Sequence, residues 1–401
     1  MTARFGLIDF DHFHTVDLPQ RLAGGNGSLA ATALTGVRPL AFRLDDGRAY
    51  TYAPAPAPHG IEITPGDAGA HTVVELAPAD WSDFVWDLRS SFALLYADRV
   101  TFPRGSFGHL ARWEPALRAA FDGQPIYDLA DPSPILDADG CPLELDRSFT
   151  LDDPDDEIRD FLERAGYVHL RGVFEPGEIG AIVADVEAAI ARARPDDQRS
   201  WWTTVDGEEV CNRVNYLNEQ SDLIAGLGAD PRLARVGTLG GPELREAPDR
   251  LDGNGVVIKV PGASSGLADL PWHRDCGMGG HPVKCPMLNV GIQLDAATAA
   301  AGQLQLIAGS HRGVSRLPAG DETKDLPVVS ITTEPGDVTA HWGHTLHAAP
   351  PPTDRRAAGR RALYVSYVNP LTFEMVGPGQ GYNDVLFTRD AGRVHHIAEL
   401  R

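Results

Sequence analysis

The chain has 401 residues, enough for two domains or for one large enzyme domain with an extension. Hydrophobic residues make up 43% and charged residues 23%, which is typical of a globular protein and excludes a disordered, collagen-like or coiled-coil chain. With 35 basic and 56 acidic residues the formal net charge is −21, a field that repels nucleic-acid backbones and anionic membrane surfaces. We therefore expect no nucleic-acid partner and no membrane insertion.

The sequence predicts a cytoplasmic protein with reduced thiols. Residues 1–15 mix charged and apolar side chains, so they predict neither a signal peptide nor an anchor. No stretch approaches the roughly 20 apolar residues that a membrane helix needs. The cysteines Cys141, Cys211, Cys276 and Cys285 form no CxxC pairs and are too few for a disulfide framework.

The first half of the chain predicts a small sheet with helices. An Asp-Asp-Gly turn between two runs rich in apolar and aromatic residues is typical of a strand–turn–strand unit. We expect strands at residues 39–44, 49–52, 61–63 and 72–76. Apolar residues at helical spacing follow in residues 80–95 and 109–121, and Asp80 is positioned to cap the first of these helical segments.

This half shows no cluster of metal ligands and no glycine-rich phosphate loop, which favours a structural or binding module over a second catalytic site. The order of its elements, with the DGRAYTY, IEI and TVVEL segments and the acidic-Trp segment PADW, resembles the sterol carrier protein type 2-like family over residues 10–128. The resemblance implies an apolar tunnel for a lipid-like ligand. A scaffold that only packs or dimerises is the alternative.

An Asp- and Pro-rich segment, residues 129–152, predicts a linker between a domain at residues 1–128 and a domain at residues 153–401. The second domain opens with a predicted amphipathic helix that ends at a glycine, then a strand and a long helix. These elements are expected at residues 155–166, 167–172 and 176–194. From residue 255 onward, short strands separated by Gly, Pro and Asp indicate a double-sheeted jelly roll. The expected class is α+β, a jelly-roll (double-stranded β-helix) core with flanking helices plus a small α/β N-terminal domain.

Two segments offer a set of metal ligands. In PWHRD, His273 and Asp275 lie two residues apart, a spacing that puts both side chains on one face of an extended segment. A third ligand is available from His341, His344 and His347. Two histidines and one carboxylate leave three open positions on an octahedral ion, an arrangement suited to non-haem Fe(II) oxygenases.

The order of motifs around these residues resembles the phytanoyl-CoA dioxygenase family of Fe(II)- and 2-oxoglutarate-dependent oxygenases. The resemblance spans residues 155–370 and includes the GYVHLRGVF opening, VIKVPG, the HxD pair, the GSHRG turn, a Gly-Asp pair and RRAL. It implies that His273, Asp275 and His347 bind iron, with 2-oxoglutarate as cosubstrate and O2 as oxidant.

The resemblance also implies that Arg360 pairs with the distal carboxylate of 2-oxoglutarate, for which a planar guanidinium fork is suited. Arg361 is the adjacent alternative. Arg213 lies where the family has a second basic residue that reaches the oxo acid, and a plain surface arginine is the other interpretation of this residue.

The chain departs from the family at two positions. Gly291 stands where members often carry Trp, and Arg274 stands where many have Gln, so cosubstrate packing is expected to differ. The carboxylate of Asp275 favours hydroxylation over halogenation. His341 and His344 are expected to pack or to contact substrate.

The implied reaction couples oxidative decarboxylation of 2-oxoglutarate, to succinate and CO2, with oxidation of an unactivated C–H bond. The expected substrate is a small, hydrophobic, lipid-like or natural-product metabolite. The alternatives are a jelly-roll metalloenzyme of other chemistry, an isomerase or hydrolase that has no use for Arg360, and a lipid-binding carrier whose second half has lost activity. Formation of a homodimer is left open.

Overall fold

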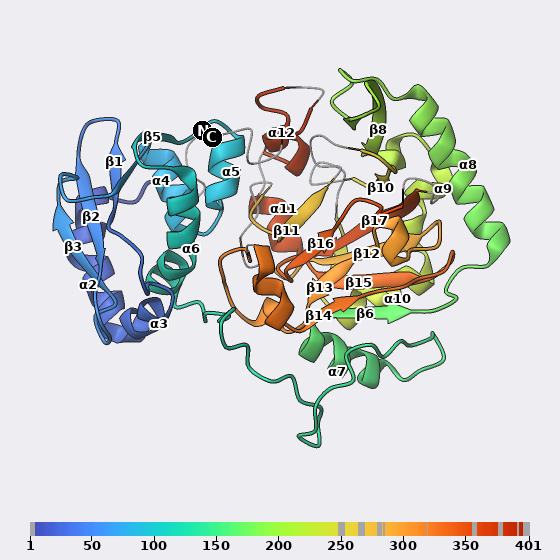
Figure 1. Cartoon of the computed structure of the whole chain (residues 1–401), viewed down its shortest axis with the longest axis horizontal. Coiled ribbons are helices and arrows are strands. Elements are labelled where there is room, and N and C mark those ends of the chain that lie inside the picture. The colour runs from blue at the N-terminus through green and yellow to red at the C-terminus, as the bar shows by residue number, and fades with distance from the viewer. Residues whose placement is uncertain are drawn as a thin grey trace.

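The computed structural model describes residues 5–247, 253–263, 269–278, 283, 285–318, 320–354, 359–375, 380–390 and 393–395. The chain forms a small α/β unit, blue to teal in Figure 1, beside a larger unit that runs from green to red. An irregular segment after α6 (Phe107–Asp122) connects the two units. The expected mixed α+β class is confirmed at this level.

The N-terminal unit is built on a five-stranded sheet in the order β3-β2-β1-β4-β5. Its strands are β1 (Leu40–Leu44), β2 (Ala49–Pro54), β3 (Ile61–Pro65), β4 (Thr72–Leu76) and β5 (Thr101–Arg104). The four predicted strands are confirmed, and β5 was not predicted. β1 and β2 pair antiparallel across a turn in which Gly47 has φ 90°, a conformation that favours glycine, whereas β1 and β4 run parallel.

Helices pack on this sheet around a core rich in aromatic side chains. The helices are α1 (Phe10–His12), α2 (Leu18–Arg21), α3 (Gly27–Thr32), α4 (Pro78–Val85), α5 (Ser91–Tyr96) and α6, with π-helical turns at Phe13–Asp17 and Leu22–Asn26. Trp81, Trp113 and Phe121 are among the core side chains with 2% exposure or less.

The predicted helical run over residues 80–95 is broken into α4 and α5, because Asp87 adopts a left-handed φ of 64° between them. The expected cap at Asp80 is wrong. Ala77 is the cap residue of α4 and Pro78 begins the helix, so Asp80 lies inside the first turn, where burial raises its pKa.

The C-terminal unit opens as predicted. α7 (Asp155–Ala165) ends at Gly166, whose φ is 89°, and β6 (Tyr167–Leu170) and α8 (Pro176–Arg192) follow. Further helices are α9 (Asp222–Ala225), α10 (Pro231–Leu239), α11 (Pro370–Met375) and α12 (Tyr382–Leu386).

Two antiparallel sheets form the centre of this unit. The larger sheet has the order β6-β15-β12-β17-β10-β8-β7, with β9 paired to β17, and the smaller has the order β11-β16-β13-β14. The larger sheet contains β7 (Ser200–Val205), β8 (Glu208–Val214), β9 (Arg245–Glu246), β10 (Gly255–Lys259), β12 (Leu288–Gln293), β15 (Val338–Trp342) and β17 (Arg360–Val368). The smaller sheet contains β11 (Leu270–His273), β13 (Gln305–Ile307), β14 (Val328–Ser330) and β16 (His347–Ala349). The hairpin of β7 and β8 was not predicted.

Alternate residues of the larger sheet have opposite surroundings. Val290, Leu363 and Val365 are buried in one cluster with residues of α7, α8 and α10, so this face is covered by helices. The residues between them, such as Asn289 and Tyr364, face the smaller sheet and line a pocket. The two faces therefore divide into an apolar core and a polar site.

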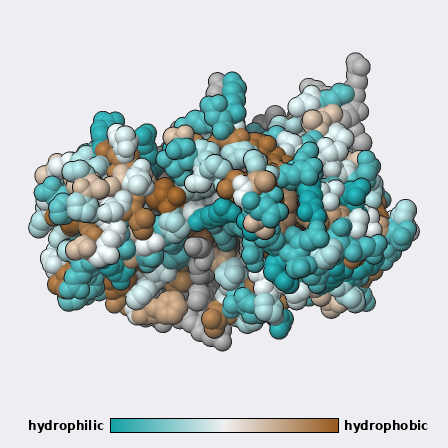
Figure 2. Space-filling model, turned by 90° about the horizontal axis from the view of Figure 1, so that it is seen from below, coloured by the Kyte–Doolittle hydropathy of each residue, from teal (hydrophilic) through white to brown (hydrophobic). Residues whose placement is uncertain are grey.

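The outer surface is mainly hydrophilic on the face seen in Figure 2, with hydrophobic side chains gathered near the junction of the two units. In the part of the chain that the structure describes, we find no helix with the length and apolar character needed to cross a bilayer.

Candidate active site

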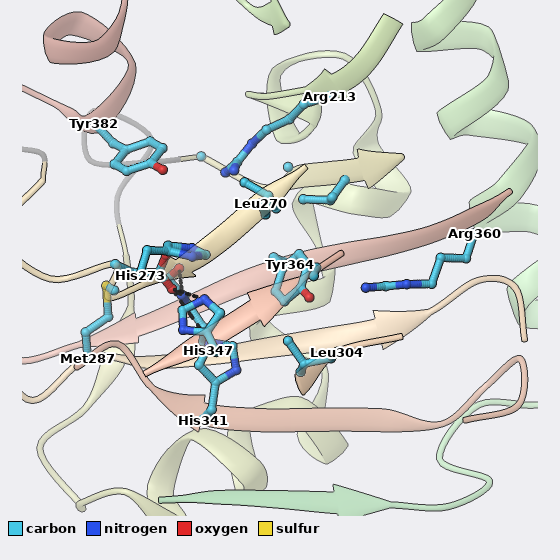
Figure 3. Close-up of a pocket in the computed structure, with 17 residues that line it drawn as sticks. Arg213, Leu270, His273, Met287, Leu304, His341, His347, Arg360, Tyr364 and Tyr382 are labelled. Carbon is cyan, nitrogen blue, oxygen red and sulfur yellow. Dashed lines mark hydrogen bonds and ion pairs between the residues drawn. The ribbon is translucent and has the colours of Figure 1, made fainter. Parts of the chain in front are cut away.

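The three predicted metal ligands meet between the two sheets of the C-terminal unit (Figure 3). His273 ends β11 and His347 begins β16, and the two are direct partners in the antiparallel register, while Asp275 lies in the turn after β11. One ligand atom from each residue lies within 4.8 Å of the others. Nε2 of His273 is 3.5 Å from Oδ1 of Asp275, and Nε2 of His347 is 3.5 Å from Oδ2.

Backbone carbonyls orient both imidazoles. Nδ1 of His273 lies 2.7 Å from the carbonyl oxygen of Pro271, and Nδ1 of His347 lies 2.9 Å from that of Thr345. Since a carbonyl only accepts hydrogen bonds, each Nδ1 carries the proton and donates it. Each Nε2 then keeps its lone pair and faces Asp275, as in metal sites whose ligand histidines are held from behind.

The charge state of the cluster suits a divalent cation. Burial by itself would raise the pKa of Asp275, but the imidazoles of His347, His273 and His341 outweigh it and hold this pKa well below the usual range. Burial, together with His273, lowers the pKa of His347 well below its usual range. An ionised Asp275 carboxylate beside the neutral imidazole of His347 and the Nε2 of His273 is a donor set that would fit Fe(II).

A hydrogen-bonded pair that the sequence did not single out holds the carboxylate. Nδ2 of Asn289 donates to Oδ2 of Asp275 at 2.5 Å, and the Ser366 hydroxyl donates to Oδ1 of Asn289 at 2.5 Å. Asn289 and Ser366 are register partners on β12 and β17. The sequence did contain a signal for this contact, because Asn289 is a polar residue inside the largely apolar strand segment LNVGIQ.

The structure separates the two adjacent arginines. Arg360 is 1% exposed, lines the same pocket as the triad, and donates from Nε to the carbonyl of Gly302 at 2.7 Å. Arg361, the next residue along β17, points to the opposite face, where it forms ion pairs with Asp295 and Glu187 at 2.8 and 3.0 Å. Of these two adjacent arginines, Arg360 is the one that lines the pocket.

Lys259 is a second buried cation, which the sequence analysis missed although it lies within VIKVPG. It is 1% exposed, is the register partner of Arg360, and donates from Nζ to the carbonyl of Ala349. Burial and the nearby charge of Arg360 lower the pKa of Lys259 to about 7. Two buried cations on neighbouring strands favour an anion such as a carboxylate in the adjoining pocket.

At Gly291, where the family often has Trp, the space beside the backbone is filled by Tyr364. Gly291 and Tyr364 are register partners, and a Cβ at Gly291 would lie 2.8 Å from the Tyr364 ring, so the ring occupies the space above the glycine. Burial lowers the pKa of Arg360, and the neighbouring Tyr364 opposes this shift. In the view of Figure 3, Tyr364 lies between Arg360 and the triad.

Arg274 and Arg213 have distinct environments. Arg274 donates to the carbonyls of His344 and Ser315 at 2.9 and 3.0 Å, so it links the HxD turn to two other loops. Arg213 lines the triad pocket, donates to Asn215 at 2.7 Å, and lies 4.5 Å from the centroid of the Trp201 ring. Arg213 is therefore a partly buried residue of the pocket lining, and its contact with 2-oxoglutarate stays a prediction.

The remaining histidines divide into neighbours of the site and distant ones. His341 is 1% exposed and its Nε2 lies 3.6 Å from Oδ2 of Asp275, so it packs against the triad. His344 lies 6.2 Å, ring to ring, from His311, which is hydrogen-bonded to the Glu163 carbonyl. His281, His396 and residues 377–379 lie outside the described residues.

The sequence profile of the phytanoyl-CoA dioxygenase family matches residues 162–358. No curated protein sequence matches the chain.

Solved structures with similarity include AviO1 from Streptomyces viridochromogenes, at 24% identity over 55% of this chain and 96% of that chain, with a TM-score of 0.44. They also include the non-heme alpha-ketoglutarate-dependent carbocyclase SnoK from nogalamycin biosynthesis. It matches at 20% identity over 56% of this chain and 87% of that chain, with a TM-score of 0.45. EctD from S. alaskensis with 2-oxoglutarate and 5-hydroxyectoine matches at 20% identity over 62% of this chain and 87% of that chain, with a TM-score of 0.46.

Fe(II), 2-oxoglutarate and O2, the cofactors expected for this chain, are those that the phytanoyl-CoA dioxygenase family uses. The C-terminal region, over residues 162–358, therefore contains a domain of the phytanoyl-CoA dioxygenase family, within the Fe(II)- and 2-oxoglutarate-dependent oxygenase superfamily.

Proposed function

We propose that the protein is a 2-oxoglutarate-dependent dioxygenase that hydroxylates, or otherwise oxidises, an unactivated C–H bond of an apolar metabolite. His273, Asp275 and His347 hold the iron, and Arg360 binds the distal carboxylate of 2-oxoglutarate. The observation that carries the proposal is that Arg360 and the three-residue cluster line one pocket. An isomerase or hydrolase would need the cluster but not the buried guanidinium.

When bound, Fe(II) supplies the oxidation chemistry that couples decarboxylation of 2-oxoglutarate to attack on the substrate. The protein residues prepare the site for it. Asp275 contributes a negative charge, fixed in orientation by Asn289, and the two imidazoles present lone pairs because their Nδ1 protons are bonded to carbonyls. Arg360 and Lys259 neutralise the dicarboxylate in a buried pocket, where a charge-assisted hydrogen bond is stronger than in water.

The finer structural assignments belong to the same proposal. Two antiparallel sheets with the ligand cluster between them support a jelly-roll core for residues 153–401. The order of the elements along the chain supports a sterol carrier-like module at residues 1–128, with residues 129–152 as the linker. A cytoplasmic location is proposed with it, and the formation of a homodimer stays open.

Anaerobic titration with Fe(II) and then 2-oxoglutarate tests the function. A weak visible charge-transfer band should appear only after both additions, because it needs the oxo acid chelated to iron. Protein loaded with Zn(II) is the matched control and should give no band. Bound iron without a band at saturating 2-oxoglutarate would contradict the proposal.

Replacing Asn289 by Ala should weaken Fe(II) affinity about 10- to 100-fold, since partners that orient metal ligands contribute effects of this size. Without the hydrogen bond from Asn289, the Asp275 carboxylate is free to rotate away from the imidazoles. Equilibrium dialysis under anaerobic conditions measures the affinity. Asn212→Ala, a buried Asn on β8 outside the pocket lining, is the control and should bind iron as the wild type does.

Lys259 should make 2-oxoglutarate binding pH-dependent. Its pKa of about 7 means that the ammonium is charged below this pH and increasingly neutral above it. A carboxylate beside it favours the charged form, so binding takes up a proton above pH 7, and the Kd should rise with pH by up to about tenfold per unit. We expect Lys259→Met to bind more weakly at low pH and to lose this slope, measured with the chelate band at saturating metal. If the Kd for 2-oxoglutarate changed with pH in the same way in the wild type and in Lys259→Met, Lys259 would not contribute to the pH dependence.

A further inference from the structure

A cavity of about 950 Å³ lies between the N-terminal unit and the smaller sheet of the C-terminal unit. Helices α5 and α6 provide one wall, including Phe92 and Ala111. β11 and the loop with Leu317 provide the opposite wall. Figure 1 shows α5 and α6 facing this side of the C-terminal unit. The volume is at the upper end of the range of roughly 300–1,000 Å³ typical of ligand pockets.

This interdomain cavity adjoins the triad pocket. Leu270, His273 and Tyr382 line both spaces. The triad pocket itself has a volume of only about 70 Å³, which does not hold an organic substrate beside 2-oxoglutarate. A substrate must therefore place most of its body in the interdomain cavity and reach the iron site past His273.

Hydrogen bonds connect the N-terminal wall to the turn that carries Asp275. The Ser90 hydroxyl, which caps α5 by accepting from the Ala93 amide, donates to the carbonyl of Gly277 at 2.8 Å. The Val283 amide donates to the Asp87 carbonyl at 3.0 Å. Gly277 is only two residues beyond Asp275, so the wall and the metal ligand are held in one arrangement.

The N-terminal unit also supports α12, which provides Tyr382 at the junction of the two spaces. Tyr96 of α5 is buried in one cluster with Val385 and Leu386 of α12. Arg389, just after α12, donates to the Leu95 carbonyl at 3.1 Å. Both walls of the cavity, and helix α12 at its junction with the triad pocket, therefore depend on contacts between the units.

The lining is largely apolar and aromatic. Its apolar members include Phe92, Tyr96, Phe107, Trp272, Leu317 and Tyr382.

Most charged side chains of the lining already have ion-pair or carbonyl partners. Arg118 is paired with Glu114 at 2.9 Å, Arg316 is paired with Glu322, and Arg274 donates to backbone carbonyls. Arg112 and Asp269 are exposed and lie toward solvent. The interior thus favours a ligand with little charge.

We propose that this cavity is the substrate chamber and that the substrate is a large, mainly apolar molecule whose body packs between α6 and the smaller sheet. The inference rests on the proposed oxygenase function. It makes the N-terminal unit a wall of the substrate site, and the substrate larger than the small metabolite that the sequence analysis expected.

Binding of N-phenyl-1-naphthylamine, a neutral apolar dye that fluoresces in apolar sites, tests the chamber on the full chain loaded with Zn(II). Ala111→Trp and Leu317→Trp each place an indole in the cavity, from opposite units. Each should weaken dye binding by about tenfold or more. Ala184→Trp, on the exposed side of α8, is the matched control and should bind as the wild type does. Thermal unfolding of all four proteins verifies that the variants are folded.

A second measurement locates the dye. Its proton relaxation should be strongly enhanced in Mn(II)-loaded protein relative to Zn(II)-loaded protein, and Ala111→Trp should remove the enhancement. Unchanged dye binding in folded Ala111→Trp, or dye binding without relaxation enhancement, would contradict the proposal that this cavity is the substrate chamber. Neither result affects the chelate band, and absence of that band would instead reject the oxygenase function.

Discussion

Asp275→Ala is expected to lose Fe(II) binding and all 2-oxoglutarate turnover. The carboxylate is the anionic member of the ligand cluster and lies 3.5 Å from both Nε2 atoms, so its loss leaves two neutral imidazoles to hold a dication. Partners that only orient ligands contribute about 10- to 100-fold to affinity, so removal of a ligand itself should exceed about 100-fold. Iron content after anaerobic dialysis and CO2 release from labelled 2-oxoglutarate measure the two losses.

Asp295→Ala is the control for this change. Asp295 also pairs with a cation, but on the helix-covered face with Arg361, outside the lining of the triad pocket. It should retain iron binding and turnover. If Asp275→Ala kept the wild-type iron content while remaining folded, the ligand assignment would be wrong.

Arg360→Ala should raise the KM for 2-oxoglutarate by about 100-fold or more, because removing one partner of a buried charge pair costs about 3–5 kcal/mol. Arg360 is 1% exposed, so little water is available to replace the guanidinium. Fe(II) affinity should be unchanged, because the arginine is not one of the clustered ligands. Turnover at varied 2-oxoglutarate and separate iron titrations distinguish the two effects.

Arg361→Ala provides a control one residue away on the same strand. It removes ion pairs with Asp295 and Glu187, which are partly exposed and contribute about 1 kcal/mol or less each. The KM for 2-oxoglutarate should therefore stay within about twofold of the wild type. Unchanged turnover in Arg360→Ala would favour the alternative of a metalloenzyme with other chemistry.

Sequence alone determined the features that depend on local geometry. The strand–turn–strand at Gly47, the helix that ends at Gly166, and the spacing of His273 and Asp275 follow from preferences that extend over a few residues. The same local reasoning failed between α4 and α5, because the left-handed Asp87 interrupts an otherwise helical pattern.

The tertiary structure decided which distant residues meet. His347 faces Asp275 because β11 and β16 pair in one register, and Arg360 rather than Arg361 enters the pocket because successive strand residues point to opposite faces. The sequence did not indicate which of the two arginines enters the pocket, because helices cover the other face of the sheet and both arginines have hydrogen-bond or ion-pair partners. The positions of Lys259 and of the N-terminal cavity wall, to which we assign roles by proposal, could not be predicted from the sequence for the same physical reason. Strand register and packing between units, and not local preference, bring these segments together.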